Sequence, residues 1–235
     1  MKNKAIAIIG GMGPQASAYM YKLLIGMAQK EFGAKNNNDY PEIILYSVPV
    51  PDFISNKKNQ KIALEMLEDV VIKINNINVS ILAIACNTAH LLVPDLEKLS
   101  KNTFVSMIDE VVKKVKKSRI NKVGILGTPS TINSKLYQTA LSKYKIESIV
   151  PDSEQQIILD KIIRNILGGK IMKKDRNSLI DIANSLKHQG AKGIVLGCTE
   201  LPLIFPAKYT LPMYNSIKIL SLTLLRKYYK SNTID

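Results

Sequence analysis

Short apolar runs alternate with longer amphipathic stretches along the chain, and this alternation limits the possible fold more than any other feature. The runs are rich in Ile, Val, Leu and Ala without strict polar alternation, which is typical of strands covered on both faces. The βαβα order predicts an α/β fold with mostly parallel sheets flanked by helices. The expected strands are Ala5–Ile9, Ile43–Tyr46, Ser80–Ala85, Val123–Leu126 and Gly193–Leu196. The expected helices are Ala16–Lys30, Lys61–Asn75, Thr88–Lys98, Asp109–Lys117, Ile132–Lys143, Glu154–Leu167, Ser178–Gln189 and Ile217–Tyr229.

A weak internal repeat divides the chain into two halves. One strand in each half runs into a loop of small residues, at Gly10 and at Gly127. A later buried strand in each half ends in cysteine, at Cys86 and at Cys198. Because open α/β sheets bind ligands outside the carboxyl ends of their strands, we expect two similar α/β halves, each with one cysteine at a ligand-binding edge. The expected lobes are residues 1–108 with 213–235, and residues 109–212.

The composition is that of an ordinary globular protein, with 46% hydrophobic and 22% charged residues. No apolar run approaches the roughly 18–20 residues that a membrane-spanning helix needs. The apolar run Ala5–Ile9 is too short for the core of a signal peptide, and it leads into glycines rather than a cleavage site. These features predict a cytoplasmic protein with no membrane partner.

The formal net charge of +14 raises the question of a nucleic-acid partner. The lysines are scattered, and the densest group, Lys113-Lys114 with Lys116-Lys117, is not interleaved with aromatic residues on which bases could stack. The pattern favours a solvated, lysine-rich surface, and we expect no nucleic-acid partner.

The two cysteines are too few for a disulfide-stapled secreted scaffold. Together with His90 and His188 they show no CxxC or HxxxH spacing, so a zinc site is not predicted. We expect neither a metal nor another cofactor.

Cys86 and Cys198 are the main candidates for chemistry. Each is expected between a buried strand and a helix N-terminus, where the helix dipole and exposed N–H groups favour the thiolate. A single free cysteine is more often a small buried hydrophobe, but these two occupy matching positions of a repeat. Two equivalent acid–base groups suit inversion of a carbon, since one thiolate removes a proton from one face while the opposite thiol donates to the other. No Cys–His–carboxylate arrangement supports acyl transfer.

The glycine-rich loop 10–17 offers backbone N–H groups for an anion such as a substrate carboxylate. Its GxGxxA spacing also matches a dinucleotide-binding fingerprint, but the second strand ends in Tyr46-Ser47-Val48-Pro49 without the acidic residue that this function requires. In the equivalent loop of the second half, Thr128 and Thr131 offer hydroxyl donors, with helix capping as the alternative.

His90 and the pair Lys57-Lys58 are weaker candidates for a functional role. His90 follows Cys86 by four residues, and a structural role is as well supported as an active one. Lys57 and Lys58 follow a proline-containing loop and could reach an anionic substrate, although such pairs are mostly surface charge.

With these residues in view, the chain resembles the cofactor-independent aspartate/glutamate racemase family over nearly its whole length. Four segments carry the resemblance: Gly10-Gly11-Met12-Gly13-Pro14-Gln15-Ala16-Ser17, Ala85-Cys86-Asn87-Thr88-Ala89-His90, Leu126-Gly127-Thr128 and Leu196-Gly197-Cys198-Thr199-Glu200. The resemblance implies that Cys86 and Cys198 are the catalytic pair. It implies two pseudo-symmetric α/β lobes with the active site between them. It also implies no pyridoxal phosphate and a homodimer acting on an amino acid. The carboxylate-binding positions of the family fall on Met12, Asn87, Thr88, Thr199, Thr128 and Thr131.

The chain departs from the family pattern at three positions that bear on the substrate. Phe53 follows Pro51-Asp52 where aspartate-specific relatives often have arginine, Leu167 stands near a family lysine, and Asn215 replaces a frequent aspartate. Lys57, Lys58, Arg164 or Lys170 could supply the missing positive charge. We expect aspartate or glutamate as the substrate, with a less acidic amino acid as the alternative.

Two other functions stay open at this point. A related isomerase or decarboxylase, such as a maleate isomerase, arylmalonate decarboxylase or hydantoin racemase, would also use strand-end cysteines, although decarboxylation needs only one protonating thiol. A non-catalytic amino-acid-binding protein on the same fold is the alternative from another class.

Overall fold

The computed structural model describes residues 5–52 and 57–232, and at residues 57, 58, 231 and 232 it describes the backbone only. The chain forms two units, Met1–Met107 with Ile217–Asp235 and Ile108–Ser216. Each unit contains a parallel sheet flanked by helices, which confirms the predicted fold class. Within the described residues, no helix is both long enough and apolar enough to cross a bilayer.

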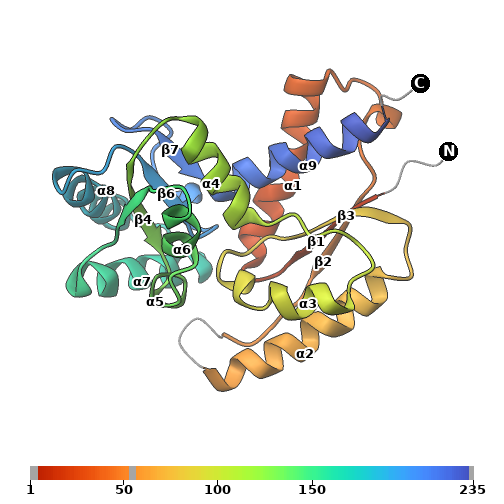
Figure 1. Cartoon of the computed structure of the whole chain (residues 1–235), viewed down its shortest axis with the longest axis horizontal. Coiled ribbons are helices and arrows are strands. Elements are labelled where there is room, and N and C mark those ends of the chain that lie inside the picture. Colours follow the sequence, from red (N-terminus) through yellow and green to blue (C-terminus); the bar gives the residue numbers. More distant parts are fainter. Residues whose placement is uncertain (1–4, 53–56, 233–235) are drawn as a thin grey trace. The chain divides into compact units, whose positions relative to one another are not determined.

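The first unit has a three-stranded sheet in the order β2-β1-β3 (Figure 1). Its strands are β1 (Ala5–Gly10), β2 (Ile43–Ser47) and β3 (Val79–Ile84). Its helices are α1 (Pro14–Phe32), η1 (Asn37–Asp39), α2 (Lys57–Ile74), η2 (Thr88–Leu91), α3 (Val93–Leu99) and, after the second unit, α9 (Ser216–Asn232). Both neighbours of β1 run parallel to it, so all three strands have their carboxyl ends at one edge.

Alternate residues of the central strand supply two separate cores. Ala7 and Ile9 of β1 face a cluster that α2 and α3 complete, which we term the α2 face. Ile6 and Ile8 face a cluster that α1 and α9 complete, which we term the α1 face (Figure 1). All of these side chains are at most 1% exposed, which explains why the strand is apolar at every position instead of at every second one.

The second unit has a four-stranded parallel sheet in the order β5-β4-β6-β7. Its strands are β4 (Lys122–Gly127), β5 (Glu147–Ile149), β6 (Ile194–Gly197) and β7 (Met213–Asn215). Its helices are α4 (Met107–Lys117), α5 (Pro129–Asn133), α6 (Leu136–Ser142), α7 (Ser153–Leu167), α8 (Lys173–His188) and η3 (Leu201–Leu203). Apolar residues of α7 and α8 pack against Leu126, Ile194 and Leu196 of the sheet to form its main core.

Residues 213–216 belong to this second unit, whereas the sequence placed them in the first lobe. The reason is that β7 pairs in parallel with β6, through Met213 with Ile194 and Asn215 with Leu196. The next residue, Ser216, begins α9, and the chain enters the first unit at Ile217.

Two helices expected to be continuous are broken. The stretch 88–98 contains the 3-10 turn η2 and then α3, with Pro94 in the first turn of α3. Proline cannot lie inside a helix without losing a hydrogen bond and clashing with the preceding turn, so α3 has to begin next to it. The stretch 132–143 is divided between α5 and α6 by Lys135, whose φ of 57° is left-handed and non-helical.

The backbone conformation at Gly11 can be tested by substitution. Its φ is +93°, and a Cβ at this position would lie 2.5 Å from both the backbone N and O of Val48. Gly11→Ala is therefore expected to lower the free energy of unfolding by about 2–4 kcal/mol. The alanine would be strained by the left-handed backbone conformation, and its Cβ would displace the backbone that follows β2. Urea denaturation followed by circular dichroism measures this value.

Gly26 is the matched control, because it lies inside α1 with no atom within 4 Å of its missing Cβ. Gly26→Ala should raise the free energy of unfolding by about 0.5–1 kcal/mol. Equal effects of the two substitutions would contradict the conformation assigned to Gly11.

Candidate functional site

A cysteine lies at the carboxyl end of the sheet in each unit. Cys86 follows the last residue of β3 by two positions, and Cys198 directly follows β6. Neither is in a disulfide, and both are buried, with 8% and 6% exposure. Each precedes only a single 3-10 turn, η2 or η3, and not the longer helix that the sequence predicted. A single short turn has a small dipole, so neighbouring side chains have more influence on the charge of each sulfur.

In the first unit, four predicted site residues gather at one sheet edge. Met12 lies in the loop after β1, and Cys86, Asn87 and Thr88 follow the neighbouring strand β3. Asn87 and Thr88 are 2% and 3% exposed although both are polar. Met12 is half-buried and packs against the α2-face cluster, to which Cys86 also belongs.

His90 fixes the backbone after Cys86. The backbone N–H of Met107 donates to Nε2 of His90 at 2.9 Å, so Nε2 is an acceptor and carries no proton. The other ring nitrogen, Nδ1, must then carry the proton and donate to the carbonyl oxygen of Cys86, 2.8 Å away. His90 is therefore a neutral, buried residue that joins two segments of the first unit, and its structural role accounts for both ring nitrogens.

In the second unit, Thr128, Thr131, Cys198 and Thr199 gather at the carboxyl ends of the adjacent strands β4 and β6. All four are buried, with Cys198 the most exposed at 6%. Thr128 is the N-cap of α5: its Oγ1 accepts from the backbone N–H of Thr131 and donates to the Thr131 hydroxyl, 3.0 Å away. The capping function considered from the sequence is therefore present.

Glu200 is a residue of this edge that the sequence did not single out. Its Oε2 lies 3.0 Å from Sγ of Cys198 and 3.0 Å from Oγ1 of Thr199, and both groups donate to it. The carboxylate is only 3% exposed. The only sequence signal was its place in the segment Gly197-Cys198-Thr199-Glu200, since spacing does not show that a side chain folds back onto a sulfur two residues earlier.

Tyr137 of α6 packs behind Cys198. A Cβ added to Gly197 would lie 3.0 Å from Cε2 of Tyr137, so glycine is needed for this close approach. Burial raises the pKa of the Tyr137 hydroxyl above its usual range, and a hydrogen bond with Ser216 opposes this rise. The hydroxyl therefore stays protonated and neutral beside the sulfur.

The loop after β1 differs from the anion cradle expected of it. The Ser17 hydroxyl accepts from the backbone N–H of Gly11 at 2.9 Å and donates to the carbonyl oxygen of Gly13 at 3.1 Å. Ser17 thus closes the loop internally and occupies one N–H group that we expected to face a substrate. Met12, which the family resemblance assigned to carboxylate binding, lies in the same loop, and that role stays a prediction.

The residues proposed to carry positive charge or to mark the substrate are spread over several elements. Lys57 and Lys58 begin α2, but their side chains lie outside the described part of the chain, as does Phe53 altogether. Arg164 donates to Asp160 at 2.9 Å on α7. Leu167 packs against the α7–α8 core, Lys170 is exposed, and Asn215 ends β7 half-buried. Among the described residues, no group of three or more His, Cys, Asp or Glu side chains could hold a metal ion.

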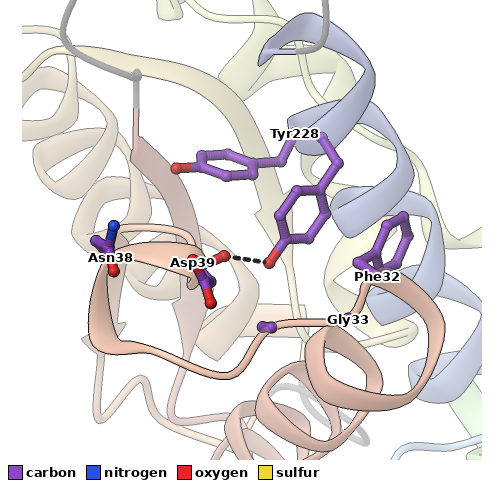
Figure 2. Close-up of a pocket in the computed structure, with 7 residues that line it drawn as sticks. Phe32, Gly33, Asn38, Asp39 and Tyr228 are labelled. Atoms are coloured by element: carbon purple, nitrogen blue, oxygen red, sulfur yellow. Dashed lines mark hydrogen bonds between the residues drawn. The ribbon is translucent and has the colours of Figure 1, made fainter.

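A cavity of about 340 Å³ lies elsewhere in the first unit, where α1 and α9 end (Figure 2). Phe32, Asp39, Tyr228 and Tyr229 line it together with smaller residues. The Tyr229 hydroxyl donates to the carbonyl oxygen of Asp39 at 2.7 Å, which ties the loop after α1 to α9. Helix α1 follows β1 and returns along the sheet, so this cavity is at the opposite edge from Cys86.

The comparisons with known proteins agree with this arrangement. The family model for Asp/Glu/hydantoin racemases matches residues 9–220. The chain is 28% identical over 196 residues to the broad specificity amino-acid racemase RacX of Bacillus subtilis (strain 168), covering 83% of this chain and 85% of that one. The structure of Picrophilus torridus aspartate racemase matches with a TM-score of 0.84 at 28% identity, over 96% of this chain and 94% of that one.

A more distant match shows the fold alone. Glutamate racemase from Francisella tularensis subsp. tularensis SCHU S4, solved with D-glutamate, has a TM-score of 0.72 at 18% identity and covers 99% of this chain and 83% of that one.

Because the family model matches most of the chain, residues 9–220, the chain belongs to the Asp/Glu/hydantoin racemase family. Racemases are isomerases, so the family resemblance and the enzyme class predicted from the sequence are both confirmed.

The protonation of His90 can be tested directly. Long-range ¹H–¹⁵N spectra should show a protonated Nδ1 and an unprotonated Nε2, with the exposed His188 of α8 as the internal reference. His90→Phe should lower the free energy of unfolding by about 1–3 kcal/mol, because it leaves the Met107 N–H without an acceptor. A proton on Nε2 would refute the assigned hydrogen-bond pattern.

Asp39 gives a pH-dependent prediction. Its carboxylate accepts backbone N–H bonds from Asn36 and Lys35, and these bonds hold its pKa below the ordinary value of 3.8. A lowered folded-state pKa gives stability that is present above the ordinary value and is lost as the pH falls through the folded-state value. The melting temperature of Asp39→Asn should therefore fall less than that of the wild type between about pH 5 and pH 2. Asp181→Asn, at an exposed position of α8, should follow the wild type.

Proposed function

We propose that the protein is an amino-acid racemase in which Cys86 and Cys198 exchange protons with the two faces of the substrate α-carbon, without pyridoxal phosphate. One observation carries the proposal: in a chain of the racemase family, each of the two sheets has a single buried cysteine at its carboxyl edge. Each cysteine is also flanked by buried amide or hydroxyl side chains that suit a carboxylate. Both features are what a two-base inversion requires.

The proposed reaction moves one proton in each of two coupled transfers. The thiolate of one cysteine takes the α-proton, so a C–H bond breaks and an S–H bond forms. The electron pair is delocalised into the substrate carboxylate as an enediolate. The thiol of the other cysteine then gives its proton to the opposite face, so the products are the inverted amino acid and a new thiolate. The reverse reaction exchanges the two roles.

The difficult step is formation of the enediolate, because the α-proton of an amino acid is a very weak acid. Hydrogen bonds aimed at the carboxylate oxygens favour that charge in the transition state, typically by several kcal/mol per site. For this role we propose the side chains of Asn87, Thr88 and Thr199 and the backbone of Met12, with Thr128 and Thr131 supporting them. Their burial strengthens such bonds because competing water is absent.

For the substrate we propose aspartate or glutamate, with Lys57 as the residue that binds the side-chain carboxylate. The aspartate racemase among the structural matches supports an acidic substrate. The similarity to RacX, described as having broad specificity, supports the less acidic alternative. The same family description includes hydantoin racemases, so a hydantoin is the second candidate class of substrate.

We also propose that the protein works as a cytoplasmic homodimer. The membership of the racemase family supports this proposal. Sedimentation velocity across a range of concentrations tests the dimer, and a species of monomer mass throughout would exclude it.

The reaction is tested by incubating reduced, metal-free protein in deuterium oxide with a panel of L- and D-amino acids and hydantoins. Proton NMR should show loss of the α-proton, and chiral chromatography should show inversion. Cys86→Ser and Cys198→Ser should each reduce inversion by about 10²–10⁴-fold, because each removes one proton-transfer group. Thr139→Ser, at an exposed position of α6, is the control and should retain wild-type activity.

The pattern of results identifies the substrate and tests the mechanism. Inversion of aspartate or glutamate supports the acidic substrate, and inversion of other compounds alone moves the assignment to them. Inversion that survives either cysteine substitution would refute the two-base mechanism, and the absence of exchange with the whole panel would refute the racemase proposal.

A further inference from the structure

The sulfur of Cys198 is in direct contact with a carboxylate, that of Glu200. One carboxylate oxygen, Oε2, accepts from both the Cys198 thiol and the Thr199 hydroxyl at 3.0 Å. Two donors on a single oxygen suit an ionised carboxylate, whose oxygens have lone pairs for both. Because an ionised carboxylate has no proton to give, the proton between Cys198 and Glu200 belongs to the sulfur.

A Cys198 thiolate beside the ionised Glu200 carboxylate is unfavourable. A Cys198 thiolate would place a second negative charge 3.0 Å from the carboxylate, at a position where both residues are at most 6% exposed. Like charges at this distance in a poorly solvated site favour the neutral form of one partner. Removal of the proton would also leave the sulfur without the acceptor that its S–H group now uses.

The equivalent position near Cys86 is uncharged. The segment Cys86-Asn87-Thr88 corresponds to Cys198-Thr199-Glu200, so Thr88 stands where the second half has Glu200. The titratable residue closest in sequence, His90, is neutral and contacts the Cys86 carbonyl oxygen through Nδ1. The repeat therefore places a negative charge two residues after one cysteine and a hydroxyl two residues after the other.

We infer that Glu200 is a positioning residue that holds Cys198 as a thiol, so that in the resting protein Cys86 is the thiolate and Cys198 the proton donor. This inference rests on the proposed function, because it assigns the starting roles of its two thiols. The substrate enantiomer whose α-proton faces Cys86 reacts with the resting form directly. After that turnover Cys86 has the proton taken from the substrate and the thiolate is on Cys198, facing the carboxylate. The repulsion favours uptake of a solvent proton by Cys198 and release of one from Cys86, which restores the resting form.

Thiol alkylation tests the inference without depending on activity. The full-length protein is treated with iodoacetamide at pH 7, and the modification of each cysteine is followed with time by peptide mass spectrometry. Thiolates react and thiols do not, and the two cysteines have similar exposure, so the rates report the charge of each sulfur. Cys86 should react at least about tenfold faster than Cys198, which corresponds to a difference of about one unit between the pKa values of the two thiols.

Glu200→Gln is the main variant, because Gln keeps the shape, removes the charge and can donate an N–H to a thiolate. In this variant Cys198 should react at least about tenfold faster than in the wild type, whereas the rate at Cys86 should stay within about twofold. Glu154→Gln, at an exposed position in the first turn of α7, is the matched control and should change neither rate. In urea the two cysteines should react at equal rates in every variant, which checks that the native difference arises from the fold.

Each outcome decides the inference. A Cys198 that reacts as fast as Cys86 in the wild type, or a rate at Cys198 that Glu200→Gln leaves unchanged, overturns it. If Glu200→Gln does not fold, the alkylation rates of Cys86 and Cys198 in the wild-type protein are compared between pH 6 and pH 9. Rates that become equal only at the alkaline end of this range support the inference. Equal rates over the whole range overturn it. Failure of the proposed function is recognised separately, as an absence of deuterium exchange.

Discussion

Burial of parallel strands from both sides is the constraint on which the rest of the structure depends. In β1, Ala7 and Ile9 face one core while Ile6 and Ile8 face the other, so no position along the strand can accept an unpaired polar group. Along β1, polar side chains are therefore confined to the points beyond the strand's ends. Parallel pairing brings those ends to one edge of each sheet, and the candidate catalytic residues of each unit gather there.

The two units use the same backbone plan with different side-chain chemistry. In each, a buried strand ends in a cysteine that is followed by a short 3-10 turn. In the first unit a neutral histidine fixes the cysteine backbone, and in the second a carboxylate binds the cysteine sulfur itself. We infer that these unequal hydrogen-bond partners give the two cysteines different resting protonation states. Proton transfer in both directions requires groups that can differ in this way.

The sequence predicted the class of fold because strands buried on two faces have a clear apolar signature. The cysteines were found for the same reason, since they directly follow two such strands. The strands β5 and β7 were missed because three residues are too few to show a period, and their existence depends on pairing with β4 and β6. The role of Glu200 was missed because it depends on side-chain torsions within a tight turn, which residue spacing does not specify. The breaks in the expected helices have local causes, a proline at position 94 and a left-handed backbone at Lys135.

The order in which the two units can fold follows from the path of the chain. The second unit is inserted between two parts of the first, because α9 returns after residue 216 to pack beside α1 (Figure 1). Ile217, Leu220 and Leu224 of α9 complete the α1 face, and until they arrive that side of the first sheet is open to water. During synthesis from the N-terminus, the inserted unit is therefore able to close its core first. The first unit is completed only when α9, which follows the inserted unit, has left the ribosome.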